Sequence, residues 1–536
     1  MKKLKLVCVA IAMACATPTL AGGLLTNTNQ HVAFNRMMSR EASIGIDGVY
    51  YNPAGVVFMG EGHHLAINWQ LAFQTRTINN DYALFTNNVN NPITPRDFKG
   101  TAFAPVIPSF QYAYNKGKWS FQASFALTGG GGKCTFDDGL GSFEKIVAET
   151  AIAACGLAGV VDQTLGNTLG QPGMEMFTSD QAFGKTGKYS FNSYMHGRQY
   201  YYGLSVGAAY KFCDNFSAFL GVRGVYALTN YYGYVENINV GNMPLYKVLD
   251  PTKESSANIE LSCDQSGVGF TPIIGVDYKT GRWNFSAKYE FKTRIRLKNK
   301  SVNQTPSIGN LPANLANQMT GILTAKYQQA GLPLEQAKQQ AENTTNAVLN
   351  DPTVGATMMG LKTQFDQKLN KAIGEYEDGK KIAGDIPGYL ALGIGYSPVD
   401  AVRVNVGFHW FDDKNATSYN NRNKELKRGT LEYNAGVEVD VNKKITLSTG
   451  WQNTNYGLSD EYMDDKSFVV GSNSAAIGGV YHINKKMDLN VAYFHTFYQH
   501  KKTSEKVQLT AEKSINYSSD YTRNNNVFAV GLDINF

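Results

Sequence analysis

The sequence predicts an all-β protein: a transmembrane barrel of about fourteen antiparallel strands, plugged by a small N-terminal hatch and carrying helical extracellular loops. Three observations support this fold class. Of the 536 residues only 18% are charged, whereas 12% are aromatic and 53 are Gly. The longest uninterrupted apolar run, residues 6–16, is about half as long as the ~20 residues of a membrane-spanning helix. Segments of about ten residues in which apolar and polar side chains alternate recur along the chain.

The first 21 residues have the composition of a secretory signal. Three lysines precede the apolar residues 6–16, and Thr19–Ala21 form a plausible cleavage site. Removing this segment takes away three lysines and lowers the formal net charge from +6 to +3. A charge this small does not predict nucleic-acid binding. We therefore expect residues 1–21 to be a signal peptide and the mature chain to leave the cytoplasm.

Alternation with a period of two places neighbouring side chains on opposite faces of a strand. Fourteen segments follow this pattern: 63–74, 105–115, 117–128, 200–212, 215–230, 266–278, 282–298, 387–397, 400–412, 428–440, 443–456, 473–483, 487–500 and 522–536. Short turns and long loops alternate between them, as in bacterial outer-membrane barrels, and such a sheet must close because lipid cannot satisfy a free strand edge. The even number of strands places the N-terminus and the C-terminus of the barrel, residues 63–536, on the periplasmic side.

Two of the predicted loops, residues 129–199 and 299–386, are too long to be simple connections. Both contain sequence patterns typical of helices, and residues 139–176 are apolar and rich in Ala and Gly. Apolar helices outside the cell suggest a place where a hydrophobic substrate lands. The equally open alternative is that these helices pack on each other as a lid.

Residues 22–62 precede the first strand without alternation, so we expect a compact hatch inside the barrel or a periplasmic tail. They contain Asn52, Pro53 and Ala54 in a Gly- and Ala-rich stretch. Together with residues 411–416, 433–444 and 472–481, this sequence resembles the FadL/TodX family of outer-membrane long-chain fatty-acid and hydrocarbon transporters. The resemblance covers essentially the mature chain. It implies that residues 22–62 form a hatch in the lumen and that Asn52, Pro53 and Ala54 lie in its plug.

The same resemblance implies that substrate leaves sideways, through a gap made by a kink in strand three. Here strand 117–128 is followed by four glycines, of which Gly129 and Gly130 are the candidate kink residues. Glycine weakens strand pairing and permits a bend or bulge. The alternative is that these glycines merely open the long loop.

Strand 282–298 carries a ladder of charges. Alternation predicts that six charged side chains point into the barrel: Lys288, Glu290, Lys292, Arg294, Arg296 and Lys298. One interpretation pairs them with the hatch and with acids such as Glu432 and Glu438, because buried charges are normally paired. In the other, Arg294 and Arg296 bind a substrate carboxylate, which suits the guanidinium fork.

Four cysteines follow the signal peptide. Cys134 and Cys155 fall in one long loop, so we expect a disulfide that closes 22 residues and stabilises the fold by about 3 kcal/mol. Cys213 and Cys263 fall near opposite rims of a ~25 Å apolar band, too far apart for a disulfide. Since no CxxC pair is present, no zinc or redox site is predicted.

The chemistry of the chain points away from catalysis. Gly203–Gly207 matches the G-x-S-x-G pattern but lies within a predicted strand, which makes a lipid-modifying outer-membrane enzyme the less favoured class. We expect no cofactor and no metal.

The resemblance implies ligand-gated, passive uptake of long-chain fatty acids or similar hydrophobic small molecules. The alternative is a receptor for aromatic compounds or haem with the same architecture. The expected partners are this substrate, outer-membrane lipid and the barrel-assembly machinery, since the terminal Phe536 resembles its recognition signal. We expect the chain to be a monomer.

Overall fold

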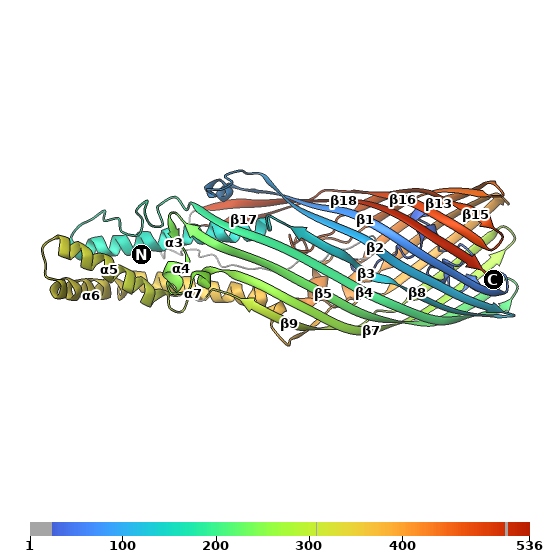
Figure 1. Cartoon of the computed structure of the whole chain (residues 1–536), viewed down its shortest axis with the longest axis horizontal. Helices are drawn as coiled ribbons and strands as arrows, with labels where there is room; N and C mark the ends of the chain where they lie inside the picture. The colour runs from blue at the N-terminus through green and yellow to red at the C-terminus, as the bar shows by residue number, and fades with distance from the viewer. Residues whose placement is uncertain (1–23, 307, 510–512) are drawn as a thin grey trace.

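The computed structural model describes residues 24–306, 308–509 and 513–536 and has the predicted fold class. Every long strand pairs with its neighbours in an antiparallel sheet (Figure 1). The first strand pairs with the last from His64 and Asn535 to Tyr82 and Tyr517, so the sheet closes into a barrel. The predicted signal peptide, residues 1–21, lies outside the described residues.

Fourteen long strands form the wall of the barrel. They are β1 Gly62–Tyr82, β2 Arg96–Lys116, β3 Trp119–Phe136, β4 Tyr189–Cys213, β5 Phe216–Val240, β7 Ile259–Thr280, β8 Trp283–Glu290, β11 Tyr389–Val399, β12 Val402–Phe411, β13 Thr430–Asn442, β14 Ile445–Asn455, β15 Ser472–Asn484, β16 Met487–Tyr498 and β18 Ser514–Asn535. Further strands extend the wall at one end: β6 Met243–Pro244, β9 Arg296–Gln304, β10 Lys381–Ala383 and β17 Lys501–Gln508. Strands β1 to β5 run well past the predicted segments. The buried faces of their outer portions carry apolar residues such as Phe98, Met195 and Val235, which join the core formed with α3 (Gly141–Leu169).

The helices lie in two places. Those beyond one end of the barrel, which we call the helical end, are α3 Gly141–Leu169, α4 Tyr246–Leu249, α5 Leu311–Gln329, α6 Leu334–Leu349 and α7 Pro352–Ile373 (Figure 1). Inside the barrel lie α1 Val32–Met37, α2 Gly48–Tyr51 and the 3-10 turn η1 Gly55–Phe58. Further 3-10 turns occur in the loops: η2 Ala83–Asn87, η3 Glu254–Ala257, η4 Gly374–Tyr376, η5 Asp413–Asn415 and η6 Tyr419–Glu425. The opposite end of the barrel, where β18 ends, is the short-turn end.

Helix α3 is long and apolar enough to cross a membrane by composition, with a mean hydropathy of 1.4 over its best window. Glu149 and Gly156 interrupt its apolar residues, so no uninterrupted apolar run of membrane-spanning length indicates this helix. In the structure α3 contacts α6 and α7. Its buried side chains join the apolar core of the helical end.

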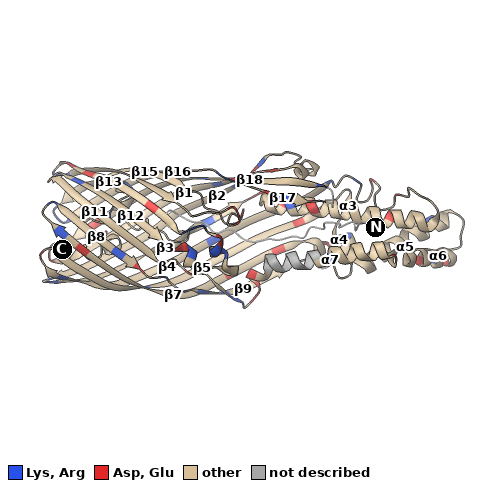
Figure 2. Cartoon of the chain, turned by 180° about the vertical axis from the view of Figure 1, so that it is seen from behind, with Lys and Arg blue, Asp and Glu red and all other residues tan. Residues whose placement is uncertain are grey.

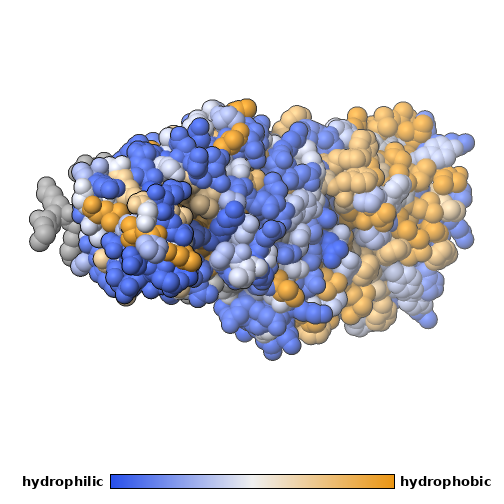
Figure 3. All heavy atoms as spheres, turned by 60° about the vertical axis from the view of Figure 1, so that its left-hand side comes forward, coloured by the Kyte–Doolittle hydropathy of each residue, from blue (hydrophilic) through white to orange (hydrophobic). Residues whose placement is uncertain are grey.

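The wall of the barrel is apolar outside and polar inside. Trp69, Leu220 and Phe270 are among many large apolar side chains that are exposed on its outer face. Asn68, Gln111 and Asn525 are buried on its inner face. The space-filling view shows apolar residues gathered over the barrel and a mostly hydrophilic helical end with a smaller apolar patch (Figure 3). This arrangement fits a barrel surrounded by lipid.

The predicted strand 282–298 is interrupted, which corrects the predicted charge ladder. Strand β8 ends at Glu290 and β9 begins at Arg296. Lys288 and Glu290 are buried in β8, but after the interruption Ile295 and Leu297 are the buried residues. The buried residues have even numbers up to Glu290 and odd numbers after it. The alternation therefore switches faces at the interruption. Arg294, Arg296 and Lys298 therefore lie on the outside of the barrel and not in the lumen.

The predicted disulfide is also wrong, because Cys134 and Cys155 are both free. The prediction placed Cys134 in a loop, whereas β3 continues to Phe136 and fixes Cys134 in the wall, opposite Ala102. Cys155 lies on α3, where its thiol donates to the carbonyl of Phe183 at 3.4 Å. The two thiols thus belong to separate rigid elements.

Candidate functional site: the plug and a break in the barrel wall

The wall is interrupted between β2 and β3. The ladder joins residues 109–116 to 119–126 and resumes where residues 100–102 meet 134–136. Among the described residues, no ladder pair joins the two strands in between. Pro105 and Pro108 lie in this part of β2 and lack the N–H that a strand donates to its neighbour. Two prolines within one strand were a sequence signal for the break that the sequence analysis did not use.

The glycines of β3 lie at this break. The register between β3 and β4 shifts on both sides of Gly130. Gly130 has φ 74° and Gly132 has φ 105°, conformations that favour glycine. A Cβ on Gly130 would lie 2.4 Å from the carbonyl oxygen of Gln199. The backbone of β3 can bend here because residues 129–132 have no side chains.

The edge of β3 that the break frees is covered by the N-terminal segment, residues 25–27. Thr26 pairs with Gly129 in an isolated antiparallel bridge. Asn27 donates its N–H to Thr128 at 2.9 Å and its side-chain amide to Leu127 at 3.1 Å. A Cβ on Gly129 would lie 2.7 Å from the carbonyl oxygen of Leu25, so the close approach also requires glycine. The sequence analysis did not identify this segment.

The same segment is continuous with the plug. The Gln30 carbonyl accepts hydrogen bonds from Ser109 and Gln111, both at 2.7 Å, on the β2 side of the barrel interior. The Tyr51 hydroxyl donates to the carbonyl of Thr28 at 2.6 Å and accepts the Gln30 N–H at 3.0 Å. The filler of the break and the plug therefore form one hydrogen-bonded unit.

An apolar cluster lies between the plug and the break. Its members come from the plug, from both edges of the break and from the far wall: Phe34, Met38, Tyr50, Tyr51, Ala72, Ile107, Leu127, Ala476, Phe494 and Val527. Phe34 and Tyr51 stack with ring centroids 5.1 Å apart. Ile107 and Leu127 lie on the two strands that the break separates. The mostly polar lumen thus has an apolar zone directly behind the break.

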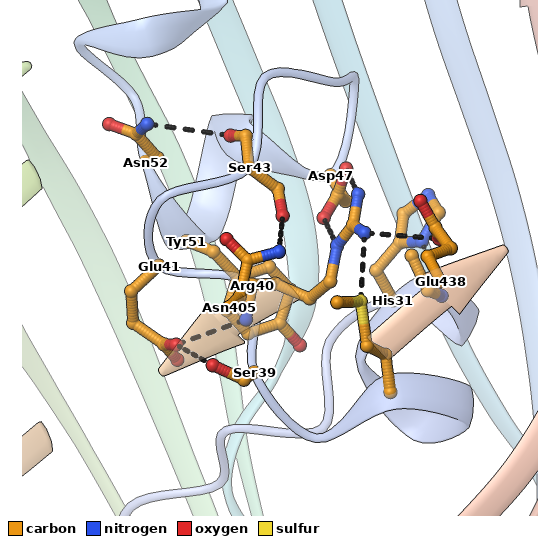
Figure 4. Close-up of polar contacts among 12 residues, drawn as sticks. His31, Ser39, Arg40, Glu41, Ser43, Asp47, Tyr51, Asn52, Asn405 and Glu438 are labelled. Atoms are coloured by element: carbon orange, nitrogen blue, oxygen red, sulfur yellow. Dashed lines mark hydrogen bonds and ion pairs between the residues drawn. The ribbon is translucent and has the colours of Figure 1, made fainter. Parts of the chain in front are cut away.

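The residues Asn52, Pro53 and Ala54 lie inside the barrel and bind three strands of its wall. The Asn52 amide donates to Asp277 of β7 at 2.6 Å, and its oxygen accepts the Gly55 N–H at 3.2 Å. The Pro53 carbonyl accepts from Gln122 of β3, and the Ala54 carbonyl accepts from Ser217 of β5, both at 2.7 Å. Asn52 also reaches the carbonyl of Ser43 within the plug (Figure 4).

Buried charges fasten the plug on the opposite side. Arg40 binds Asp47 at 2.7 Å within the plug and Glu438 of β13 at 3.3 Å (Figure 4). Arg36 pairs with the same carboxylate. Glu41 binds His409 of β12 at 2.7 Å. Buried ions require such partners, so separating the plug from the wall would leave charges without compensation.

The inward members of the predicted charge ladder also hold the plug. The Lys288 ammonium donates to the carbonyl of Tyr50 at 2.6 Å and binds Glu290 at 2.9 Å. Glu290 in turn accepts both terminal nitrogens of Arg223. Charged residues also occur at other places along the wall (Figure 2). For Lys288 and Glu290, the geometry thus agrees with the interpretation that the charges pair with the hatch.

Two cavities lie on the helical-end side of the plug. The first, of about 110 Å³, is almost wholly apolar and is lined by side chains of α3, α4, α5 and their loops, including Leu157, Val161, Phe177, Leu249 and Leu315. The second, of about 420 Å³, is lined by polar residues together with Leu25, Tyr201, Leu297 and Ile382. The helices therefore pack on each other and still leave an apolar pocket. Leu25, beside the break, forms part of the wall of the second cavity.

The described residues contain no group of three or more His, Cys, Asp or Glu that could hold a metal ion. Ser205 of the G-x-S-x-G match lies within β4 and accepts a hydrogen bond from Arg223 at 3.0 Å. It therefore lacks the strand-to-helix turn that a hydrolase nucleophile occupies.

Comparisons with known proteins give a match in structure but not in sequence. No protein-family model and no curated protein matches the chain. The crystal structure of a Pseudomonas aeruginosa FadL homologue matches 96% of this chain and all of its own, with a TM-score of 0.58 at 14% identity. The TodX deltaS2S3 mutant, a monoaromatic hydrocarbon channel, matches over the same shares with a TM-score of 0.51 at 13% identity. The resemblance to the FadL/TodX family is thereby confirmed as a resemblance in fold.

Proposed function

We propose that this protein is a passive outer-membrane channel for hydrophobic small molecules, and that these leave the barrel sideways through the break between β2 and β3. The observation that carries the proposal is the apolar zone behind the break. It joins the plug to Ile107 and Leu127, which lie at the two edges of the break. In a lumen lined by polar residues, this zone gives an apolar solute a favourable path to the surrounding lipid.

The plug closes the direct route to the short-turn end. Its helices and loops are almost wholly buried, and buried ion pairs with β12 and β13 hold it in place. A solute that enters between the helices therefore meets the apolar pocket first, then the larger cavity, and then the segment formed by residues 25–27. Displacement of this segment opens the wall, which makes the channel gated by its own N-terminal segment.

The orientation follows from the outer-membrane architecture. The helical end faces outward from the cell, and the short-turn end, where β1 begins and β18 ends, faces the periplasm. Residues 1–21 act as the secretory signal. Phe536, whose side chain is exposed where β18 meets β1, is the contact for the barrel-assembly machinery. The chain acts as a monomer, because one barrel contains the plug, the cavities and the break.

The substrate is a long-chain fatty acid or a similarly apolar molecule, with aromatic compounds and haem as the alternatives. The outward position of Arg294 and Arg296 removes them as partners of a substrate carboxylate in the lumen. Mass spectrometry of small molecules that co-purify with the protein is the first measurement of substrate class.

Transport is tested by the uptake of labelled oleate, toluene and haem into outer-membrane vesicles that contain the protein. We expect uptake of one apolar class, and its loss at equal protein level when Gly129 and Gly130 are replaced by Val, because both glycines permit the bend in β3. Unchanged uptake in this variant would contradict sideways release.

Deletion of residues 22–55 should raise the single-channel conductance, and an unchanged closed state would contradict the hatch assignment.

A further inference from the structure

The outer wall next to β9 carries a row of cations. Arg294, Arg296, Lys298 and Lys300 are all exposed, whereas Ile295 and Leu297 between them are buried. Alternate residues of an extended chain lie on one face, about 7 Å apart. The change of face at the β8–β9 interruption thus turns four charges outward that regular alternation would have placed in the lumen.

Strand β10 enlarges this row. Lys381 is exposed and pairs directly with Lys298 across the two strands. Like charges in directly opposed positions destabilise a sheet unless something neutralises them. Arg296 reaches Asp385 at 2.8 Å, and Lys300 lies opposite Asp264. For Arg294, Lys298 and Lys381, no carboxylate lies within 4.0 Å in the part of the chain that the structure describes.

The row begins where the apolar belt ends. Trp283, Phe285 and Phe291 are exposed on the same outer wall, immediately before the cations along the chain. Strand β9 continues toward α5, so the cations lie on the side of the helical end. The neighbours of such residues are the headgroups of the lipid leaflet that surrounds that end of the barrel.

We propose that Arg294, Lys298 and Lys381 bind the phosphate groups of the phosphorylated glycolipid that forms the outer leaflet of the bacterial outer membrane. The inference rests on the proposed outer-membrane placement, with the helical end outside. Charge complementarity supports it, since three neighbouring cations without an acidic partner suit a headgroup with more than one phosphate. Binding would fix the depth of this side of the barrel relative to the leaflet.

The test uses the full-length protein extracted from outer membranes in one detergent. The variant R294Q/K298Q/K381Q is compared with wild type and with K326Q/K338Q/K506Q, which removes three exposed lysines of α5, α6 and β17. Native mass spectrometry counts the bis-phosphorylated glycolipid on each protein. We expect occupancy on the order of tenfold lower in the first variant. We expect no change in the second, and equal binding of enzymatically dephosphorylated glycolipid by all three proteins.

Equal retention of the phosphorylated glycolipid in the first variant would overturn the proposal. The same fold-loss for phosphatidylglycerol in nanodiscs would also overturn it, because the site would then accept any anionic lipid. Proteolysis of the helical loops on intact cells separates this inference from the proposed function. Protected loops would refute the outer-membrane placement itself, whereas cleaved loops with equal retention would refute only the glycolipid site.

Discussion

The barrel wall is interrupted twice, and the two interruptions differ in what fills them. Between β2 and β3 the gap is covered by residues 25–27, which come from the plug and are held mainly by backbone hydrogen bonds. The second gap lies along β7, between its ladder with β8 and its ladder with β9. The residues that join β8 to β9 fill this gap. Ile295 packs where Gly267 and Gly269 of β7 leave room, and a Cβ on either glycine would lie within 2.8 Å of its side chain.

A missing ladder therefore does not by itself make an opening. The β8–β9 junction is closed by side chains that belong to the wall and cannot leave it without unfolding a strand. The β2–β3 break is closed by a separate segment whose contacts can be exchanged. Substitutions at each interruption should therefore have different effects on uptake and on stability.

The largest effect is expected from locking the segment of residues 25–27 to β3. Thr26 and Gly129 form an isolated antiparallel bridge, a geometry within the Cα distance that a disulfide spans. The directly opposed pair next to this bridge contains no glycine, and its Asn27 N–H donates to the Thr128 carbonyl at 2.9 Å. In a C134S background, oxidised N27C/T128C should therefore lose uptake of the apolar substrate almost completely and regain it with a reductant. Uptake is followed in outer-membrane vesicles.

The matched control is T293C/I386C, which joins the isolated bridge at the second interruption. Because that interruption is permanently filled, its disulfide should leave uptake unchanged. Inhibition by both disulfides would show that the two interruptions are not different in kind.

Removing the main ionic tether of the plug should have the next largest effect. R40L leaves the buried carboxylates of Asp47 and Glu438 without this partner, which should lower the stability of the plug by about 3–5 kcal/mol. We expect a larger single-channel conductance in planar bilayers. R403L removes a half-buried partner of the same Glu438 from the wall and should leave the closed state intact; leakage in R403L alone would contradict this assignment.

Equivalent truncations at the two interruptions should affect different properties. Ile295 is fully buried, so I295A should lower the free energy of unfolding by about 2–4 kcal/mol without changing uptake. L127A enlarges the apolar path at the first break and should change the uptake rate more than the stability. Urea unfolding in detergent and vesicle uptake measure the two properties, and altered uptake in I295A would make the second interruption part of the route.

The smallest effect concerns the start of the segment that fills the break. Asp413, in a loop at the helical end of the barrel, accepts the Leu24 N–H at 3.1 Å and the Thr430 N–H at 2.9 Å. Burial raises its pKa to about 6, so the native state holds the proton more firmly than the unfolded state. The free energy of unfolding should therefore fall as pH rises from about 4 to about 6, and stay constant above that range. D413N should remove this component, seen as the difference between the two urea-unfolding profiles; identical profiles would contradict it.

The alternation of apolar and polar residues was enough to predict the closed barrel and its fourteen strands. Alternation with a period of two is a local property, and closure follows because lipid leaves no free edge unsatisfied. The lack of alternation before β1 indicated a separate N-terminal element, and the glycines of β3 marked where the wall could bend. Each of these features depends on residues that are close in the sequence and on the solvent that surrounds them, so it can be predicted from the sequence.

Contacts between distant segments set the face that Arg294 and Arg296 occupy, the positions of the cysteines and the closure of the break. A single change of face between Glu290 and Ile295 inverts every later side chain of that strand. It depends on the room left by Gly267 and Gly269 on another strand. The bridge from Thr26 to Gly129 joins residues a hundred positions apart. Contacts of this kind arise from which segments the closed barrel brings together, and no local pattern in either segment encodes its partner.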